Sequence, residues 1–182
     1  CELTHLQRRP IDVANAREQH HRYEERLSEL GFALLRLPAE PDMPDSVFVE
    51  DAAIVLDELA VLARPGAPSR RPEVARIAAA LEPYRTLSSI EPPACLDGGD
   101  VLRIGKVIYV GLSGRSDEAA VVQLRTMLGP LGYTVRGVPV TGCLHLKSAV
   151  TQIAPGTVLI NPCWVSPALF AGLELVEIDP SE

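Results

Sequence analysis

The chain has 182 residues, of which 47% are hydrophobic and 23% are charged. This length and composition predict one sizeable globular domain with a hydrophobic core. A net charge of -7 without a basic tract argues against a nucleic-acid-binding protein. No apolar run approaches the roughly 20 residues that cross a membrane. The four cysteines show no CxxC spacing, so we expect reduced thiols in a cytoplasmic protein.

Hydrophobic periodicity and turn residues predict an alternation of helices and strands. Gly31 ends the first helix, Ser116 is the expected N-cap of a later one, and Gly105-Lys106 is a short hairpin turn. The predicted elements, in chain order, are a helix over 12–31, a strand over 32–37, strands over 47–56 and 59–64, a helix over 71–84, a strand over 86–90, strands over 100–104 and 107–111, a helix over 116–131, a strand over 134–140, a hairpin over 144–153 and 157–161, a short helix over 167–172 and a strand over 173–178.

The order strand–strand–helix–strand therefore occurs three times, with a period of about 50 residues that is typical of repeat architectures. We expect one α/β domain over 1–182, built from modules at about 1–46 (partial), 47–91, 96–140 and 142–179. The alternative is a plain α/β domain in which this spacing is a coincidence.

Polar groups recur near the first strand of each hairpin, and in a ring of modules they would meet at one place. In the third module, His145 and Lys147 are two residues apart, so a strand would place both on one face. The recurring groups are Asp45 with Glu50 and Asp51, then Asp97 with Asp100, then His145 with Lys147. Convergent titratable groups indicate a functional site.

These residue types suit an amino-acid substrate better than a metal ion. Paired carboxylates match the planar donor fork of a guanidinium, and the arginines Arg70 and Arg115, expected to be exposed, suit a carboxylate. His145 suits proton transfer near neutral pH. Each residue also has a structural alternative: a solvated strand end for Glu50-Asp51, a turn for 97–100, a structural histidine, surface arginines and core cysteines.

Six strings in this order, CELTHL, DSVFVED, RPGAPSRRPE, LDGGDVL, VGLSGR and GCLHLKSA, resemble the dimethylarginine dimethylaminohydrolase family of the guanidine-modifying superfamily. The resemblance implies an α/β propeller (pentein) of five ββαβ modules around a central pocket. It implies hydrolysis of Nω-methylated L-arginine to L-citrulline and a methylamine, without metal or organic cofactor. A cysteine thiolate would attack the guanidinium carbon and form a thiouronium intermediate.

The matching motifs imply residue roles. His145 would transfer protons and Asp97 would orient it. Asp45, Glu50 and Asp51 would line the substrate site, with Asp51 gripping the guanidinium. Arg70 and Arg115 would hold the substrate's carboxylate, and Leu3 would belong to a loop that covers the pocket.

The sequence departs from the family pattern at the nucleophile. None of Cys1, Cys95, Cys143 and Cys163 matches the nucleophile position, so we expect a chain truncated at both ends, with roughly three and a half of the five modules. The complete enzyme would act on a small molecule, and a homodimer is left open. Alternatives are an inactive module that binds an arginine analogue or a partner protein, a related hydrolase such as arginine deiminase, and an N-terminal Cys1 nucleophile.

Overall fold

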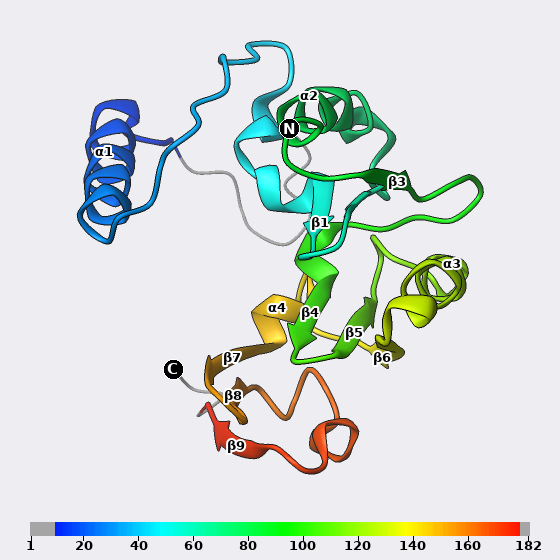
Figure 1. Ribbon diagram of the computed structural model, residues 1–182. Coiled ribbons are helices and arrows are strands. Elements are labelled where there is room, and N and C mark those ends of the chain that lie inside the picture. The colour runs from blue at the N-terminus through cyan, green and yellow to red at the C-terminus, as the bar shows by residue number, and fades with distance from the viewer. Residues whose placement is uncertain (1–9, 179–182) are drawn as a thin grey trace. The chain divides into compact units, whose positions relative to one another are not determined.

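The computed structural model of the protein describes residues 10–178 (Figure 1). The chain forms two compact units, Cys1–Asp42 and Met43–Glu182. No helix in the described range 10–178 is long and apolar enough to cross a membrane.

The first unit contains helix α1, Val13–Glu29, which confirms the helix predicted over 12–31. The Asp12 side chain accepts a hydrogen bond from the Asn15 backbone N–H at 3.0 Å and caps the helix. The strand predicted over 32–37 is wrong, because residues 32–40 have no regular structure. An extended segment becomes a strand only when a neighbouring strand takes up its backbone hydrogen bonds, and this apolar run has no such neighbour among the described residues.

Within the described part of the second unit, the strands form three sheets, each made of three strands. In each sheet the first two strands are an antiparallel hairpin, and the third strand returns parallel to the second. The strands are β1 Ala53–Val55, β2 Ala60–Leu62, β3 Leu87–Ser89, β4 Val101–Ile104, β5 Val107–Leu112, β6 Thr134–Pro139, β7 Val150–Ala154, β8 Thr157–Ile160 and β9 Glu174–Glu177. The predicted threefold order of two strands, a helical segment and a third strand is confirmed, with a 3-10 turn as the helical segment of the last module.

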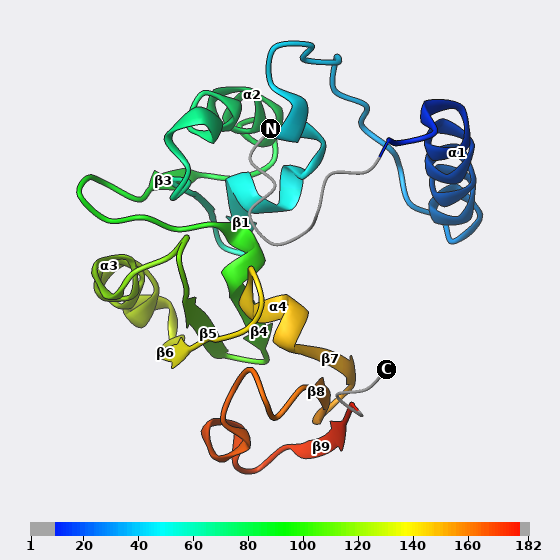
Figure 2. The ribbon, with the colours of Figure 1, turned by 180° about the vertical axis from the view of Figure 1, so that it is seen from behind.

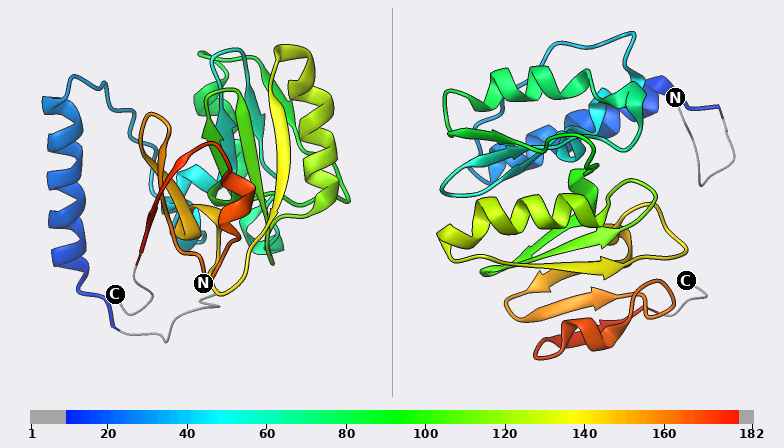
Figure 3. Two further views of the ribbon diagram at one scale, coloured as in Figure 1. Left: turned by 90° about the horizontal axis from the view of Figure 1, so that it is seen from below. Right: turned by 90° about the vertical axis from the view of Figure 1, so that its right-hand side faces the viewer.

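A helical segment makes each parallel return possible, since a parallel connection needs a crossover. The crossover is α2, Glu73–Leu81, in the first module and α3, Glu118–Leu128, in the second. A single 3-10 turn, Pro167–Phe170, replaces the helix in the third module. Figure 3 shows α3 running along the sheet that contains β6.

The core is divided between two clusters of buried apolar side chains. The first joins the β1–β3 and β4–β6 sheets to one face of α3, from which Ala120, Val121, Leu124 and Leu128 project at helical spacing. The second surrounds the β7–β9 sheet, where the rings of Tyr109 and Phe170 stack at 4.8 Å between centroids. Consecutive modules therefore share their cores.

The strand predicted over 47–56 is mostly wrong. Two 3-10 turns, Pro44–Val47 and Val49–Ala52, come first, and β1 begins only at Ala53. The physical reason is a buried arginine. The backbone carbonyls of Asp45 and Phe48 accept hydrogen bonds from Arg70, so they are turned away from a strand ladder.

The strand predicted over 144–153 begins at β7 Val150, and His145 lies before a short helix, α4 Leu146–Ala149 (Figure 2). The same-face argument for His145 and Lys147 is therefore wrong. The Leu146 N–H donates to the Asp100 carboxylate at 2.9 Å, which satisfies the first turn of α4 from outside. Ser116 is also not the N-cap of α3; the side chain of Asp117 caps that helix.

Candidate active site

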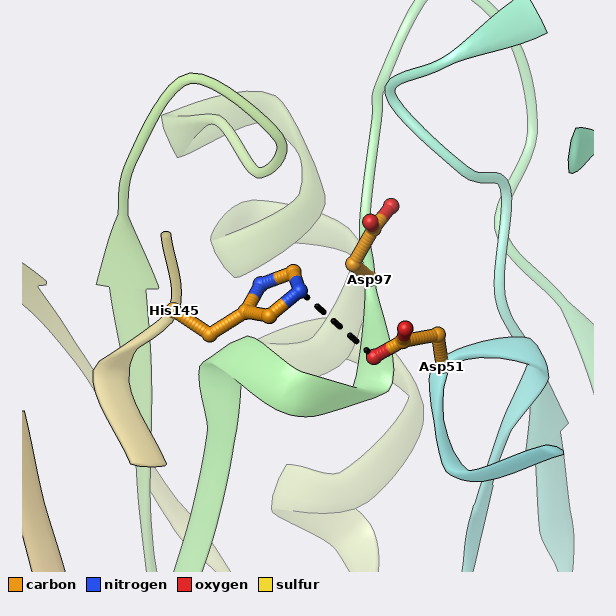
Figure 4. A group of neighbouring side chains, drawn as sticks. All are labelled: Asp51, Asp97 and His145. Atoms are coloured by element: carbon orange, nitrogen blue, oxygen red, sulfur yellow. Dashed lines mark ion pairs between the residues drawn. The ribbon is translucent and has the colours of Figure 1, made fainter. Parts of the chain in front are cut away.

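Three segments that are far apart in the sequence bring polar side chains to one place (Figure 4). Asp51 lies in the turn Val49–Ala52, Asp97 directly precedes the turn Gly98–Asp100, and His145 directly precedes α4. One carboxylate oxygen of each aspartate and one ring nitrogen of His145 lie within 4.8 Å of one another. The predicted convergence of these three residues from three modules is confirmed.

Asp51 is buried and already has protein partners on both oxygens. Its Oδ2 accepts a hydrogen bond from Arg70 Nη1 at 2.6 Å, and its Oδ1 accepts one from the Gly99 backbone N–H at 2.9 Å. Its Oδ1 also lies 3.8 Å from His145 Nε2. Asp51 thus stands between a fixed cation and the imidazole ring.

Arg70 is 7% exposed, and the expectation that it is an exposed residue is wrong. Its guanidinium donates to Asp51, to the Glu73 carboxylate at 2.8 Å from Nη2, and to the backbone carbonyls of Asp45 and Phe48. Burial of the guanidinium opposes its charge, but the hydrogen bonds with Glu73 and Asp51 outweigh burial and raise the pKa of Arg70. The donors that were expected to hold a substrate's carboxylate are engaged inside the protein.

His145 is largely buried, with carboxylates on both sides of its ring. Its Nδ1 lies 3.5 Å from Asp100 Oδ2, which is longer than a normal hydrogen bond, and has no hydrogen-bond partner among the described residues. Burial works to lower the pKa of His145. The adjacent Asp100 carboxylate, followed by the charges of Asp51 and Asp97, outweighs burial and raises that pKa above its ordinary value.

Asp97 is 1% exposed, and one of its two carboxylate oxygens has a hydrogen-bond partner. Its Oδ1 accepts a hydrogen bond from the Gly66 backbone N–H at 2.9 Å, whereas its Oδ2 is buried with no partner among the described residues. Burial raises the pKa of Asp97, and the hydrogen bond from Gly66 offsets this only in part. The nearest ion-pair partner of His145 Nδ1 is Asp100, so the orienting role expected for Asp97 stays a prediction.

The other residues implied by the motifs lie around this group. The exposed carboxylate of Glu50 accepts a hydrogen bond from Lys147 Nζ at 2.6 Å. Asp45 is half-buried and contributes its carbonyl to Arg70. Arg115 is half-buried, and its positive charge works against the rise in the pKa of Asp97 without reversing it. Leu3 lies outside the described residues.

The thiols within residues 10–178 differ in their surroundings. Cys143 lies two residues before His145; its Sγ donates to the His145 carbonyl at 3.3 Å, and burial raises its pKa. The hydrogen bond with the His145 backbone works to lower this pKa, but burial outweighs it, and a raised pKa favours the neutral thiol, which is a poor nucleophile. Cys95 contacts Arg64 Nη1 at 3.4 Å, and Cys163 is exposed. Cys1 lies outside the described residues.

Comparison with known proteins gives one consistent result. The chain is 45% identical over 170 residues to the N(G),N(G)-dimethylarginine dimethylaminohydrolase of Streptomyces coelicolor, covering 92% of this chain and 66% of that protein. It is 31% identical to the enzyme of the same name from Pseudomonas aeruginosa, covering 94% of this chain and 68% of that protein. The structure of a Pseudomonas aeruginosa variant complexed with citrulline superposes with a TM-score of 0.88, at 30% identity over 94% of this chain and 68% of that one. No family model matches the chain.

The chain belongs to the dimethylarginine dimethylaminohydrolase family. The resemblance seen in the six sequence motifs is confirmed, and the α/β fold of the second unit is that of the family. The chain spans about two thirds of the length of these two relatives, 66% and 68%. The number of modules and the closure of a propeller stay predictions.

Asp51, Asp97 and His145 of this chain lie close enough together to hold a metal ion. We do not assign them as metal ligands. Asp51 is paired with the cation Arg70, and both of its carboxylate oxygens already accept hydrogen bonds from the protein.

Sequence reasoning gave no role to three residues of this site. Glu73 forms a buried ion pair with Arg70. It follows Arg70 by three residues at the start of a predicted helix, and this spacing is a sequence signal that could have predicted the pair. Asp100 was placed in the right cluster without a role. Gly99 lies so close to the site that a Cβ there would be 2.7 Å from Asp51 Oδ1 and 2.8 Å from the His145 ring.

Proposed function

We propose that the complete protein hydrolyses Nω-methylated L-arginine to L-citrulline and a methylamine, and the name of its two relatives, N(G),N(G)-dimethylarginine dimethylaminohydrolase, supports this. The observation that carries this proposal is the buried Asp97 Oδ2 beside His145 and Asp51, which has no hydrogen-bond partner within residues 10–178. A buried acceptor without a donor costs about 1–3 kcal/mol, and a guanidinium N–H from a ligand would remove that cost. The citrulline bound to the Pseudomonas aeruginosa relative is the product of this chemistry.

In this proposal two carboxylates hold the guanidinium. Asp97 accepts through Oδ2, and Asp51 accepts through the free lone pair of Oδ1 while Arg70 and Gly99 keep its position. Arg70 therefore orients Asp51 rather than binding the substrate's carboxylate. Arg115, whose charge reaches Asp97, remains the candidate for the carboxylate end. Asp45 and Glu50 line the path by which the substrate reaches the site.

His145 moves the protons. A cysteine thiolate of the complete protein attacks the guanidinium carbon, and His145 gives its proton to the departing methylamine as the C–N bond breaks. His145 then takes a proton from a water molecule that attacks the thiouronium carbon. The C–S bond breaks, the thiolate is regenerated and citrulline leaves. The raised pKa of His145 favours the protonated form that the first step needs.

We also propose that the modules belong to an α/β propeller of the pentein type, with residues 1–182 as part of one domain. The three consecutive ββαβ modules and their shared cores support this arrangement. We also propose a cytoplasmic location, because the four cysteines show no CxxC spacing and no disulfide framework in the sequence. A homodimer stays open.

Turnover by the protein made from its whole reading frame tests the function. Wild type should form citrulline from asymmetric dimethylarginine, and a His145→Gln variant should lose about 10²–10⁴-fold in rate while its near-UV circular dichroism is unchanged. Equal turnover by a folded His145→Gln variant would remove His145 from the mechanism. Wild type that binds a methylated arginine without turnover would instead support the inactive binding module.

A further inference from the structure

We propose that Asp100 is a positioning residue for His145, holding the imidazole and the first turn of α4 with one buried carboxylate. This inference deepens the proposed function and rests on it for the reaction that His145 performs.

The Asp100 carboxylate is fully buried, with a side-chain exposure of 0%. Its Oδ1 accepts from the Leu146 N–H at 2.9 Å, and its Oδ2 accepts from the hydroxyls of Ser113 and Ser116, each at 2.7 Å. The ring Nδ1 of His145 is 3.5 Å from the same Oδ2. A buried carboxylate is costly unless its lone pairs are satisfied, and here three donors satisfy them before the imidazole is counted.

These contacts connect the segments that carry the site. Ser116 Oγ also accepts from the Asp97 backbone N–H at 3.0 Å, and Ser113 Oγ accepts from the Arg115 backbone N–H at 2.9 Å. Asp100 therefore joins the Asp97 turn, the Arg115 loop and the His145 segment through hydrogen bonds. The network consists of protein groups alone, and such hydrogen bonds to a supporting residue restrict the positions that a site residue can take.

Gly99 and Gly111, which have no side chains, leave the space that the side chains of His145 and Asp100 occupy. A Cβ at Gly111 on β5 would lie 2.7 Å from Asp100 Oδ1, and a Cβ at Gly99 would lie 2.8 Å from the His145 ring. The ring is thus in contact with backbone on one side and with a carboxylate at Nδ1. Both constraints restrict its rotation.

The arrangement assigns different work to the two ring nitrogens. A carboxylate beside Nδ1 favours a proton on that nitrogen, and this leaves Nε2 as the nitrogen that exchanges protons. Nε2 faces Asp51, where the guanidinium is proposed to bind. Three carboxylates surround the ring, those of Asp51, Asp97 and Asp100. Cys143 lies in the loop before His145, and Lys147, on the helix after it, pairs with Glu50. Arg70 and Arg115 act on the ring through Asp51 and Asp97.

Histidine titration by NMR on the 182-residue chain tests the role without turnover, so its failure is distinguishable from failure of the proposed function. The four histidines are ¹⁵N-labelled, and His145 is assigned by its loss in His145→Gln. In wild type, the ¹⁵N shifts of the neutral ring should report the Nδ1–H tautomer. The Nε2–H tautomer in folded wild type would overturn the proposal, and this measurement needs no Asp100 variant.

Asp100→Asn supplies the second arm. Its amide can still accept from the Leu146 N–H and donate to a serine hydroxyl, but the negative charge beside Nδ1 is gone, so the His145 titration midpoint should move to lower pH. The matched control, Ser113→Ala, removes one hydrogen bond to Asp100 and keeps the charge, so its midpoint should stay at the wild-type value. An unchanged midpoint in folded Asp100→Asn, or equal shifts in both variants, would show a merely structural role.

Discussion

Replacing Arg70 with methionine removes the cation of a buried ion-pair group and leaves the apolar length of the side chain in place. The side chains of Arg70, Asp51 and Glu73 are 8%, 10% and 5% exposed, so solvent gives little relief to the two carboxylates left behind. Breaking a buried pair by removing one partner costs about 3–5 kcal/mol. For a chain of this size, each kcal/mol lowers Tm by about 2–4 °C, so we expect a loss of about 6–20 °C.

Thermal unfolding followed by circular dichroism measures this loss of Tm. Arg103→Met is the control, because Arg103 lies 3.7 Å from the exposed Asp57 in a pair that should contribute less than about 1 kcal/mol. Adding Glu73→Gln to Arg70→Met should recover part of the stability, since one uncompensated charge is removed. An Arg70→Met variant as stable as Arg103→Met, with weakened binding of an arginine analogue, would refute the structural role and restore Arg70 as a substrate ligand.

The remaining predictions concern the site itself. Gly99→Ala should destabilise the chain by about 1–3 kcal/mol in urea unfolding, because the added methyl group would collide with Asp51 and His145. Gly114→Ala is the control, because a Cβ added there has no atom within 4 Å. Equal stability of the two variants would contradict the close approach of Gly99 to Asp51 and His145. Asp51→Asn should weaken calorimetric binding of dimethylarginine by about 1.5–3 kcal/mol, and unchanged affinity would make Asp51 a purely structural residue. The raised pKa of His145 stabilises the fold below the ordinary histidine value of 6.5, and this contribution is lost as the pH rises through the folded-state value. The stability difference between wild type and His145→Gln should therefore shrink with rising pH, and a constant difference from pH 5 to 9 would contradict the shift.

The sequence predicted the modules because each is defined by local signals. Hairpin turns such as Gly105-Lys106 and the amphipathic helix α3 are short-range features, and both appear at the predicted places. The failures are segments whose conformation depends on distant partners. Residues 32–37 have strand composition, but no strand in the described part of the chain pairs with them, and residues 44–52 form turns because Arg70 binds the carbonyls of Asp45 and Phe48.

The site shows the same division. The motifs identified Asp51, Asp97 and His145, and the fold brings them together. The burial of Arg70 was not predictable from its position, because three of its four partners, Asp51 and the carbonyls of Asp45 and Phe48, lie on a segment that meets it only after folding. Asp100 was hidden for a similar reason. An aspartate after two glycines is typical of a turn, and nothing local indicates that its carboxylate contacts a histidine 45 residues later.

Product stoichiometry tests the central claim most directly. The protein made from the whole reading frame is incubated separately with asymmetric dimethylarginine and with arginine at equal concentration, and citrulline, dimethylamine and ammonia are measured. Hydrolysis of the methylated substrate predicts one dimethylamine for each citrulline, and little ammonia from arginine. Citrulline and ammonia from arginine alone would indicate an arginine deiminase, and a folded protein that forms no citrulline from either substrate would contradict the proposed function.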